Sequence, residues 1–160
     1  MAGAPSFNRD RAKGKEMIRI ALMIIGLCSI GALADESVGD KTAERIAKAE
    51  REDPEKRGEI YADIAHDYVA LAKDKFVAGE SEPGQAAINK SVEYAQKAAE
   101  SAKMKGKQIK KTEIRLRQCT TRLEDLARTV SVLDRDPVKA AIKQIDDLRA
   151  QLLDAMFKKK

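Results

Sequence analysis

The chain has 160 residues, of which 43% are apolar, 36% are charged and 4% are aromatic, and its formal net charge is +5. This length suits a single domain, and so high an apolar content excludes a chain that is disordered throughout. Only four Pro and few runs of β-branched residues argue against an all-β fold. Two Cys and one His exclude a disulfide scaffold and a multi-cysteine zinc site.

The first 34 residues have the composition of a secretory signal peptide. A basic stretch that ends at Arg19 is followed by an apolar run over residues 20–34, which closes with Ala32-Leu33-Ala34. This order of segments predicts export and cleavage, so that residues 1–34 engage the membrane only during export. The alternative is an uncleaved anchor, but at about 1.5 Å per residue the run spans only roughly 22 Å of a hydrocarbon core of about 30 Å. We therefore expect a periplasmic or secreted protein.

Removal of the signal segment changes the charge and the cysteine count. Residues 1–34 carry five Lys and Arg against Asp10 and Glu16, so +3 of the net charge belongs to them and +2 remains. Cys119 is then the only cysteine of the mature chain. An exported protein with one cysteine has no internal disulfide, so its stability must come from its core.

Residues 35–107 predict helices in succession. A short helix near 40–52 would turn Ala43, Ile46 and Ala47 inward within an N-terminal segment, 35–53. Asp53-Pro54 predicts the start of a first long helix that Gly79 ends. Ser81-Glu82-Pro83 starts a second one, and the short connection makes the pair antiparallel. The apolar faces of these two helices contain Tyr61, Ile64, Tyr68 and Leu71 in the first and Ile88, Val92, Ala95, Ala98 and Ala102 in the second.

Two further apolar faces follow toward the C-terminus. A narrow heptad seam over about 108–133 contains Ile109, Thr112, Leu116, Cys119, Leu123, Leu126, Val130 and Leu133. Asp136-Pro137 resembles the earlier helix start and predicts a last helix from Pro137. Its wider stripe suits the core of a bundle and contains Val138, Ala141, Ile142, Ile145, Leu148, Leu152, Leu153 and Met156.

The fold class is therefore all-α, an antiparallel bundle of three to four main helices over 54–157 with a basic tail at 158–160. One alternative stays open, because residues 88, 95 and 102 share the heptad phase of Ile109 across Gly106. A single long helix over about 83–133, straight or kinked, would be elongated, and it fits this phase slightly better. A bend near Gly106 would instead produce a compact four-helix bundle.

The residues that carry catalysis in other proteins are scarce here. His66 is expected on the outer face of its helix, with no Ser or Cys partner at a motif spacing. Cys119 lies on the seam, which predicts a packed side chain rather than a nucleophile, although Arg115 and Arg122 would lower its pKa if it were exposed. The chain has no H-E-x-x-H, C-x-x-C or phosphate-binding glycine loop. We expect no enzyme, no cofactor and no bound metal.

The most uneven charge lies between residues 103 and 122. Glu113 is the only acid there, against eight basic residues: Lys103, Lys105, Lys107, Lys110, Lys111, Arg115, Arg117 and Arg122. This set is the candidate anion-binding site, and a solvated helix face is the simpler interpretation. The absence of interleaved aromatic residues and the predicted export argue against nucleic acid as the partner.

Three strings resemble a group of uncharacterised exported all-helical bacterial proteins best known from acidobacterial genomes. The first is Asp53–Arg57. The second is Glu113–Arg117 leading to Arg122–Leu126, and the third is Asp134–Val138 with the closing Leu152–Phe157. They consist of helix caps and seam residues, so the resemblance implies a fold and no catalytic residues. Tyr61, Ala65 and Tyr68 also resemble a tetratricopeptide-like helix hairpin, but no second copy follows at a period of about 34 residues.

These features predict an exported, non-enzymatic helical interaction or structural protein of the bacterial cell envelope. Its partner would be another protein, or a second copy along the 109–133 seam. The alternative function is peripheral binding of anionic envelope polymers or lipid headgroups through residues 103–122.

Overall fold

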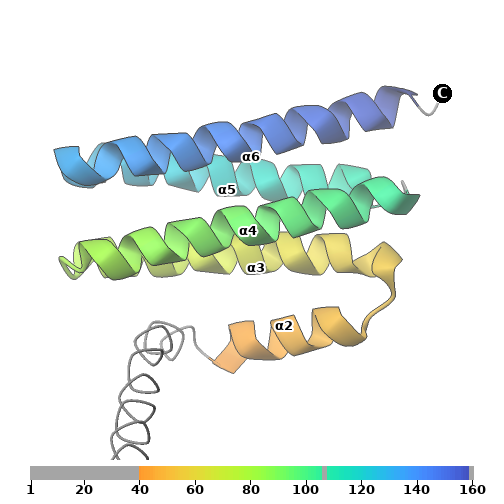
Figure 1. Ribbon diagram of the computed structural model, residues 1–160, viewed down its shortest axis with the longest axis horizontal. Helices are drawn as coiled ribbons and strands as arrows, with labels where there is room; N and C mark the ends of the chain where they lie inside the picture. The colour runs from red at the N-terminus through yellow and green to blue at the C-terminus, as the bar shows by residue number, and fades with distance from the viewer. Residues whose placement is uncertain (1–39, 106–107, 159–160) are drawn as a thin grey trace, which may run out of the picture. The chain divides into compact units, whose positions relative to one another are not determined.

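The computed structural model describes residues 40–105 and 108–158, and the elements within these ranges are all α-helices (Figure 1). In chain order they are α2 (Asp40–Arg51), α3 (Pro54–Val77), α4 (Ser81–Lys105), α5 (Ile109–Thr129) and α6 (Val132–Lys158). All belong to one compact unit, Ser37–Lys160. The all-α class is confirmed, whereas the predicted signal peptide at 1–34 lies outside the described residues.

Helices α3 to α6 form a four-helix bundle made of two antiparallel hairpins. The α3–α4 hairpin packs against the α5–α6 hairpin, with α3 beside α5 and α4 beside α6 (Figure 1). The short helix α2 packs on α3, at the place where the sequence predicted a short helix. Ile46 packs against the core as predicted, but Ala43 is exposed, and the buried residues of α2 are Thr42 and Ala49.

The prediction of one continuous helix over 83–133 is wrong. Helix α4 ends at Lys105 and α5 begins at Ile109, and α5 runs back along α3. The heptad phase continues from α4 to α5 because both helices turn the same sequence positions toward one shared core. A shared phase therefore indicates a common buried face, and it does not require that the helical axis be continuous.

The end of α3 and the start of α4 follow the local signals closely. Gly79 has φ +78°, a left-handed conformation that favours glycine. Its N–H donates to the carbonyl of Phe76 at 3.0 Å, and the N–H of Glu80 donates to the carbonyl of Lys75 at 2.9 Å. These two bonds form a Schellman motif, which satisfies the last carbonyls of α3 and turns the chain into α4.

The predicted start of the last helix at Asp136-Pro137 is also wrong. Helix α6 begins at Val132 and contains Pro137 in its interior. Ser131 provides the cap, because its hydroxyl accepts from the N–H of Asp134 at 3.3 Å and donates to the Asp134 carboxylate at 2.7 Å. Pro137 would normally interrupt the bond to the carbonyl of Leu133, but Leu133 is 90% exposed, so water can satisfy that carbonyl.

The core contains most of the predicted apolar faces. The buried residues of the seam are Ile109, Thr112, Leu116, Cys119, Leu123, Leu126 and Val130, and those of the last helix are Val138, Ala141, Ile145 and Leu152. Leu133 was expected on the seam but is exposed, because α5 ends at Thr129 and Leu133 belongs to the first turn of α6. The seam is thus buried within one chain, and self-association of the protein stays a prediction.

The α3–α4 pair packs closely because the facing residues are small. Ala95, Ala98 and Ala102 are buried on α4, as the sequence predicted. A Cβ atom built on Gly58 of α3 would lie 3.2 Å from the Ala98 carbonyl oxygen and 3.2 Å from the Ala102 nitrogen. Small side chains therefore let the two backbones approach, which leaves the bulkier residues to fill the space toward α5 and α6.

Candidate interaction surface

The basic stretch does not form one cationic face, because acids pair with several of its members. Lys111 lies 3.3 Å from Glu59, and Arg115 Nε lies 3.0 Å from Asp63, so α3 neutralises these two residues of α5. Arg117 lies 2.7 Å from Glu113 of its own helix. Lys103 donates to Gln151 of α6 at 2.6 Å. The paired carboxylates on α3 reduce the attraction of this surface for polyanions.

The other four members of the set differ among themselves. The side chains of Lys105 and Lys107 lie outside the described residues. Lys110 is exposed on α5. Arg122 is also exposed, and within the described ranges it makes no ion pair, which separates it from Arg115 and Arg117 on the same helix.

A buried charge network joins α5 to α6. Glu113 is 3% exposed and accepts hydrogen bonds from Arg117 at 2.7 Å and from Arg149 at 3.1 Å. Arg149 also donates to Asp146 at 2.6 Å and to the Thr120 hydroxyl at 3.3 Å. Burial by itself would raise the pKa of Glu113, but the hydrogen bonds and charges of Arg117 and Arg149 outweigh it, so the pKa is lowered.

This network was not predicted from the sequence. The only available signal was the isolation of Glu113 among eight basic residues. Its partner Arg149 is 36 residues away along the chain, and helical periodicity relates only residues within the same helix. The network links α5 to α6 through Glu113 and Arg149, while the side chains of Arg117 and Asp146 at its edge are 58% and 43% exposed.

His66 and Cys119 lie close to the α3–α5 interface. Burial lowers the pKa of His66, and the charge of Arg122 lowers it further, against the opposing effect of Asp67. His66 is half-buried, rather than on the outer face as predicted. Cys119 is fully buried, and burial raises its pKa to about 12 despite the opposing charge of Arg122. The thiol is therefore a packed core group, as the seam position predicted, and not a nucleophile.

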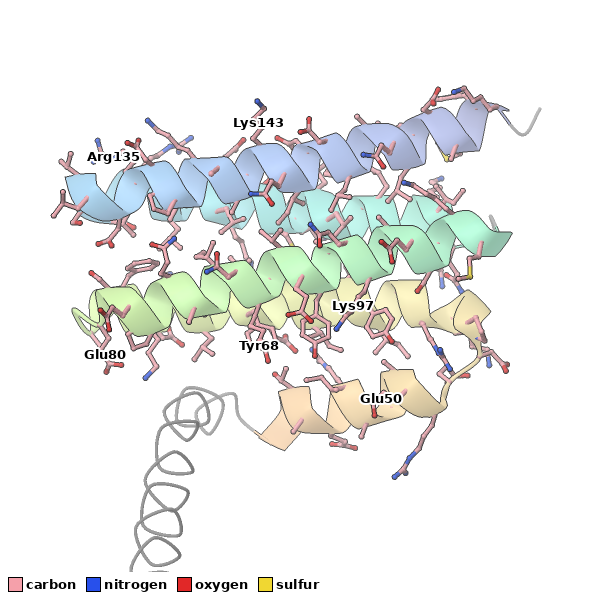
Figure 2. The ribbon with its side chains drawn as sticks, viewed as in Figure 1. Glu50, Tyr68, Glu80, Lys97, Arg135 and Lys143 are labelled. Carbon is pink, nitrogen blue, oxygen red and sulfur yellow. The ribbon has the colours of Figure 1, made fainter. Side chains whose placement is uncertain are left out.

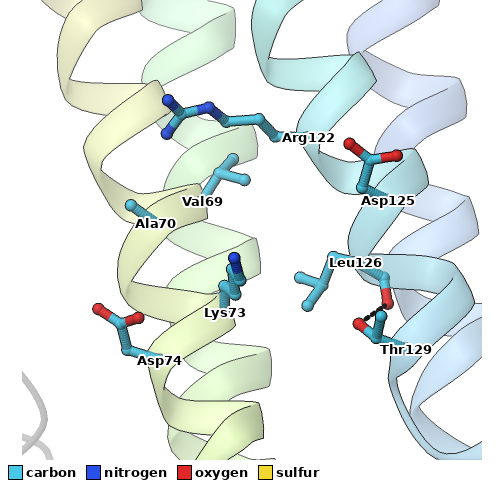
Figure 3. Close-up of a pocket in the computed structure, with 8 residues that line it drawn as sticks. All are labelled: Val69, Ala70, Lys73, Asp74, Arg122, Asp125, Leu126 and Thr129. Atoms are coloured by element: carbon cyan, nitrogen blue, oxygen red, sulfur yellow. Dashed lines mark hydrogen bonds between the residues drawn. The ribbon is translucent and has the colours of Figure 1, made fainter.

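A pocket of about 490 Å³ opens between α3 and α5 (Figure 3). We call it the α3–α5 pocket. The apolar residues among those lining it are Val69, Ala70 and Leu126, and the polar ones are Lys73, Asp74, Arg122, Asp125 and Thr129. Figure 3 shows the guanidinium of Arg122 reaching from α5 toward α3. Of this pocket, the sequence indicated only Arg122 as a binding residue, because the pairing of α3 with α5 was unknown.

A second hollow of about 340 Å³ lies between α4 and α6. Amide side chains line much of it, namely Gln85, Asn89, Gln96 and Gln144, together with the small residues Ala140 and Ala141. It differs from the α3–α5 pocket because no Lys or Arg is among its lining residues. The two hollows can therefore be compared as one that is lined by basic residues and one that is not.

Exposed large apolar side chains lie at both ends of the bundle. Met104 and Phe157, each 69% exposed, lie near the ends of α4 and α6, and another set lies at the end where α3 ends and α6 begins. Val77, at the end of α3, is 80% exposed, and Val132 and Leu133, at the start of α6, are 75% and 90% exposed. A hydrogen bond of 3.0 Å from Ser81 to Asp134 joins the start of α4 to the start of α6 at the same end. We call Val77, Val132 and Leu133 the apolar end. Helices α3 and α6 do not contact each other, so only Val132 and Leu133 are known to be neighbours in this set. Neighbouring exposed apolar residues are typical of protein contact surfaces.

The described ranges contain no group of three or more His, Cys, Asp or Glu side chains placed to hold a metal ion. None of the helices α2 to α6 has the length and apolar content needed to cross a membrane. Comparisons of the chain with protein-family models, curated proteins and solved structures gave no significant match.

Proposed function

We propose that this protein is an exported, non-enzymatic helical interaction protein of a bacterial cell envelope. The apolar end is the observation that carries the proposal, because Leu133 is 90% exposed and Val77 is 80% exposed. A single exposed apolar residue is common on any protein, whereas the neighbouring pair Val132 and Leu133, with Val77 at the same end of the bundle, favours a covering partner. The export component is supported by the sequence of residues 1–34.

The chemistry of the bundle also supports a non-enzymatic role. Cys119 is sealed in the core with a raised pKa, and the charges near His66 are the arginines and aspartates of α3 and α5. A nucleophile needs access and a nearby base, and Cys119 has no access. In this proposal the protein surface binds the partner, and the buried polar groups stabilise the folded bundle.

The interaction role is tested by photo-crosslinking in the native host. A benzophenone amino acid would replace Leu133 or Val77 at the apolar end, and Lys143 as the matched control, because Lys143 is exposed on the outer side of α6 (Figure 2). We expect a discrete adduct on irradiation at positions 133 and 77 and none at position 143. Absence of an adduct at both apolar positions would contradict the proposal.

Export is tested separately by cell fractionation and N-terminal sequencing. We expect the mature protein in the envelope or the medium, with a new N-terminus at Asp35. Full-length protein in the cytoplasm would contradict the envelope assignment.

Binding to an anionic surface is tested by co-sedimentation with anionic vesicles at low and moderate salt. Binding that fades with salt would instead favour a function of the basic stretch, residues 103–122.

A further inference from the structure

We propose that the end of the bundle where α4 and α6 end binds the surface of a membrane that contains anionic phospholipids. This contact lies opposite the apolar end, so it goes beyond the proposed interaction role and does not depend on it. Two exposed apolar side chains, Met104 and Phe157, and two exposed lysines, Lys110 and Lys158, carry the proposal. We call these four residues the basic end.

Met104 and Phe157 lie in the last turns of two neighbouring helices, and both are 69% exposed. Lys103 donates to Gln151 at 2.6 Å, so the end of α4 lies beside the last two turns of α6 (Figure 1). Phe157 is six residues beyond Gln151, which is about 9 Å along a helix. Apolar groups of peripheral proteins enter the headgroup region by roughly 5–10 Å, so one membrane surface can receive both side chains.

Two exposed cations lie at the same end of the bundle. Lys158 directly follows Phe157, and its side chain is 75% exposed. Its ion pair with Asp154 is exposed as well, so water and salt screen it. Lys110 is exposed in the first turn of α5 and pairs with no residue that the structure describes. Both ammonium groups are therefore available to the phosphates of lipid headgroups.

The charge of the sequence is divided unevenly between the two ends of the bundle. Residues 100–111 and 151–160 contain eight Lys against two acids. The corner between α2 and α3 at the same end, residues 48–59, is nearly balanced, with four basic and five acidic residues. Residues 73–84 and 125–136, at the opposite end, contain four basic and six acidic residues. An anionic surface therefore attracts the basic end and repels the apolar end.

The combination of charge with exposed apolar side chains favours a lipid surface over a soluble polyanion. A sulfated or phosphate-rich polymer can pair with the lysines, but it has no apolar region to cover Met104 and Phe157. In an anionic membrane the headgroups attract the lysines, and the acyl boundary removes the two apolar side chains from water. The expected contact is peripheral, because it uses only the end of the bundle.

The test uses tryptophan as a local reporter, since the chain contains no Trp. Phe157→Trp and Met104→Trp are each made in the full-length protein, with Leu133→Trp at the apolar end as the control. The probes are vesicles of phosphatidylcholine, with or without phosphatidylglycerol. We expect a blue shift of the emission at positions 157 and 104, and quenching by bromine-labelled acyl chains, only when phosphatidylglycerol is present. Position 133 should show neither effect.

The comparison between the two ends also controls for the apolar run at residues 20–34. All three proteins contain this run, so membrane binding through it would bring each of them to the vesicle equally. It therefore cannot produce a difference between position 133 and positions 104 and 157.

Substitutions in the Met104→Trp protein separate the charge from the apolar contact. Lys110→Gln and Lys158→Gln should each weaken vesicle binding by about threefold to fivefold, and Phe157→Ser by about tenfold. Lys143→Gln, on the outer side of α6, removes the same charge elsewhere and should have no effect (Figure 2). Higher salt should weaken binding by screening the lysines. Thermal unfolding by circular dichroism verifies that each variant is folded.

Four results would overturn the proposal: no blue shift at positions 104 and 157, an equal shift at position 133, equal responses with and without phosphatidylglycerol, or loss of binding in Arg122→Gln rather than in Lys110→Gln. The last result would assign anion binding to a part of α5 that lies about 18 Å from Lys110 along the helix. Photo-crosslinking at Leu133 and Val77 is independent of the vesicles, so failure of the membrane contact is distinguishable from failure of the proposed function.

Discussion

Glu113 and Arg149 are joined across the α5–α6 interface by an ion pair of 3.1 Å, although 36 residues separate them in the chain. Glu113 is almost completely buried, and the Arg149 side chain is 20% exposed. A buried carboxylate is stable only when its oxygens are hydrogen-bonded, and here Arg117 and Arg149 supply the donors. The pair thus defines which residues of α5 and α6 face each other.

Replacing Glu113 with Gln should destabilise the bundle. The substitution leaves Arg149 partly buried with only Asp146 as a charged partner, and we expect a loss of about 2 to 3 kcal/mol in the free energy of unfolding. Urea denaturation followed by circular dichroism measures this loss. Asp154→Asn, which removes an exposed pair with Lys158, is the control and should cost about 0.5 kcal/mol or less. Equal losses in the two variants would show that burial of the Glu113 pair adds no stability.

The stability that Glu113 contributes should depend on pH. Its folded pKa lies below the ordinary value of 4.5, so its contribution is fully present above about pH 4.5 and declines as pH falls through the folded pKa. We therefore expect the stability difference between the wild type and Glu113→Gln to be largest near neutral pH and to shrink in acid. Urea titrations at a series of pH values test this. A difference that grew with acidification would mean that the folded pKa is raised.

Cys119 should resist alkylation in the folded protein. Its pKa is raised to about 12 and its side chain is buried, so at neutral pH the reactive thiolate is both rare and inaccessible. Iodoacetamide labelling followed by peptide mass spectrometry separates Cys119 from Cys28. We expect slow labelling of Cys119 in buffer and labelling faster by several orders of magnitude in urea. Rapid labelling in buffer would restore the interpretation of Cys119 as a reactive residue.

Substitution of Pro137 tests where the last helix begins. Pro137 lies inside α6 and cannot donate to the carbonyl of Leu133, so Pro137→Ala should raise the free energy of unfolding by about 1 kcal/mol or more. Pro54→Ala is the matched control, because Pro54 occupies the first turn of α3, where the missing N–H has no cost. A neutral effect at both positions would indicate that the helix starts at Asp136 after all.

Local patterns in the sequence determined most of the helical content. Gly79 ended α3 because only glycine readily adopts its positive φ, and the apolar spacing of residues 109–126 placed them in the core. The predicted start of α6 was too late. Asp136-Pro137 resembles a helix cap, but the cap in the structure is Ser131, five residues earlier. Both Ser131 and Asp136 are residue types that can cap the start of this helix. The sequence alone does not show which of them the folded protein uses.

The sequence by itself determined that this protein is all-helical, that Cys119 is a core residue and that most of its net charge precedes residue 35. Only the tertiary structure decided that α5 runs back along α3, which acids neutralise Lys111 and Arg115, and that Lys73 and Arg122 line the same pocket. Helical periodicity describes how one segment divides its residues between two faces. Pairing of residues from different segments depends on the shape of the whole core, so the Glu113–Arg149 pair and the α3–α5 pocket emerge only when α3, α5 and α6 are packed together.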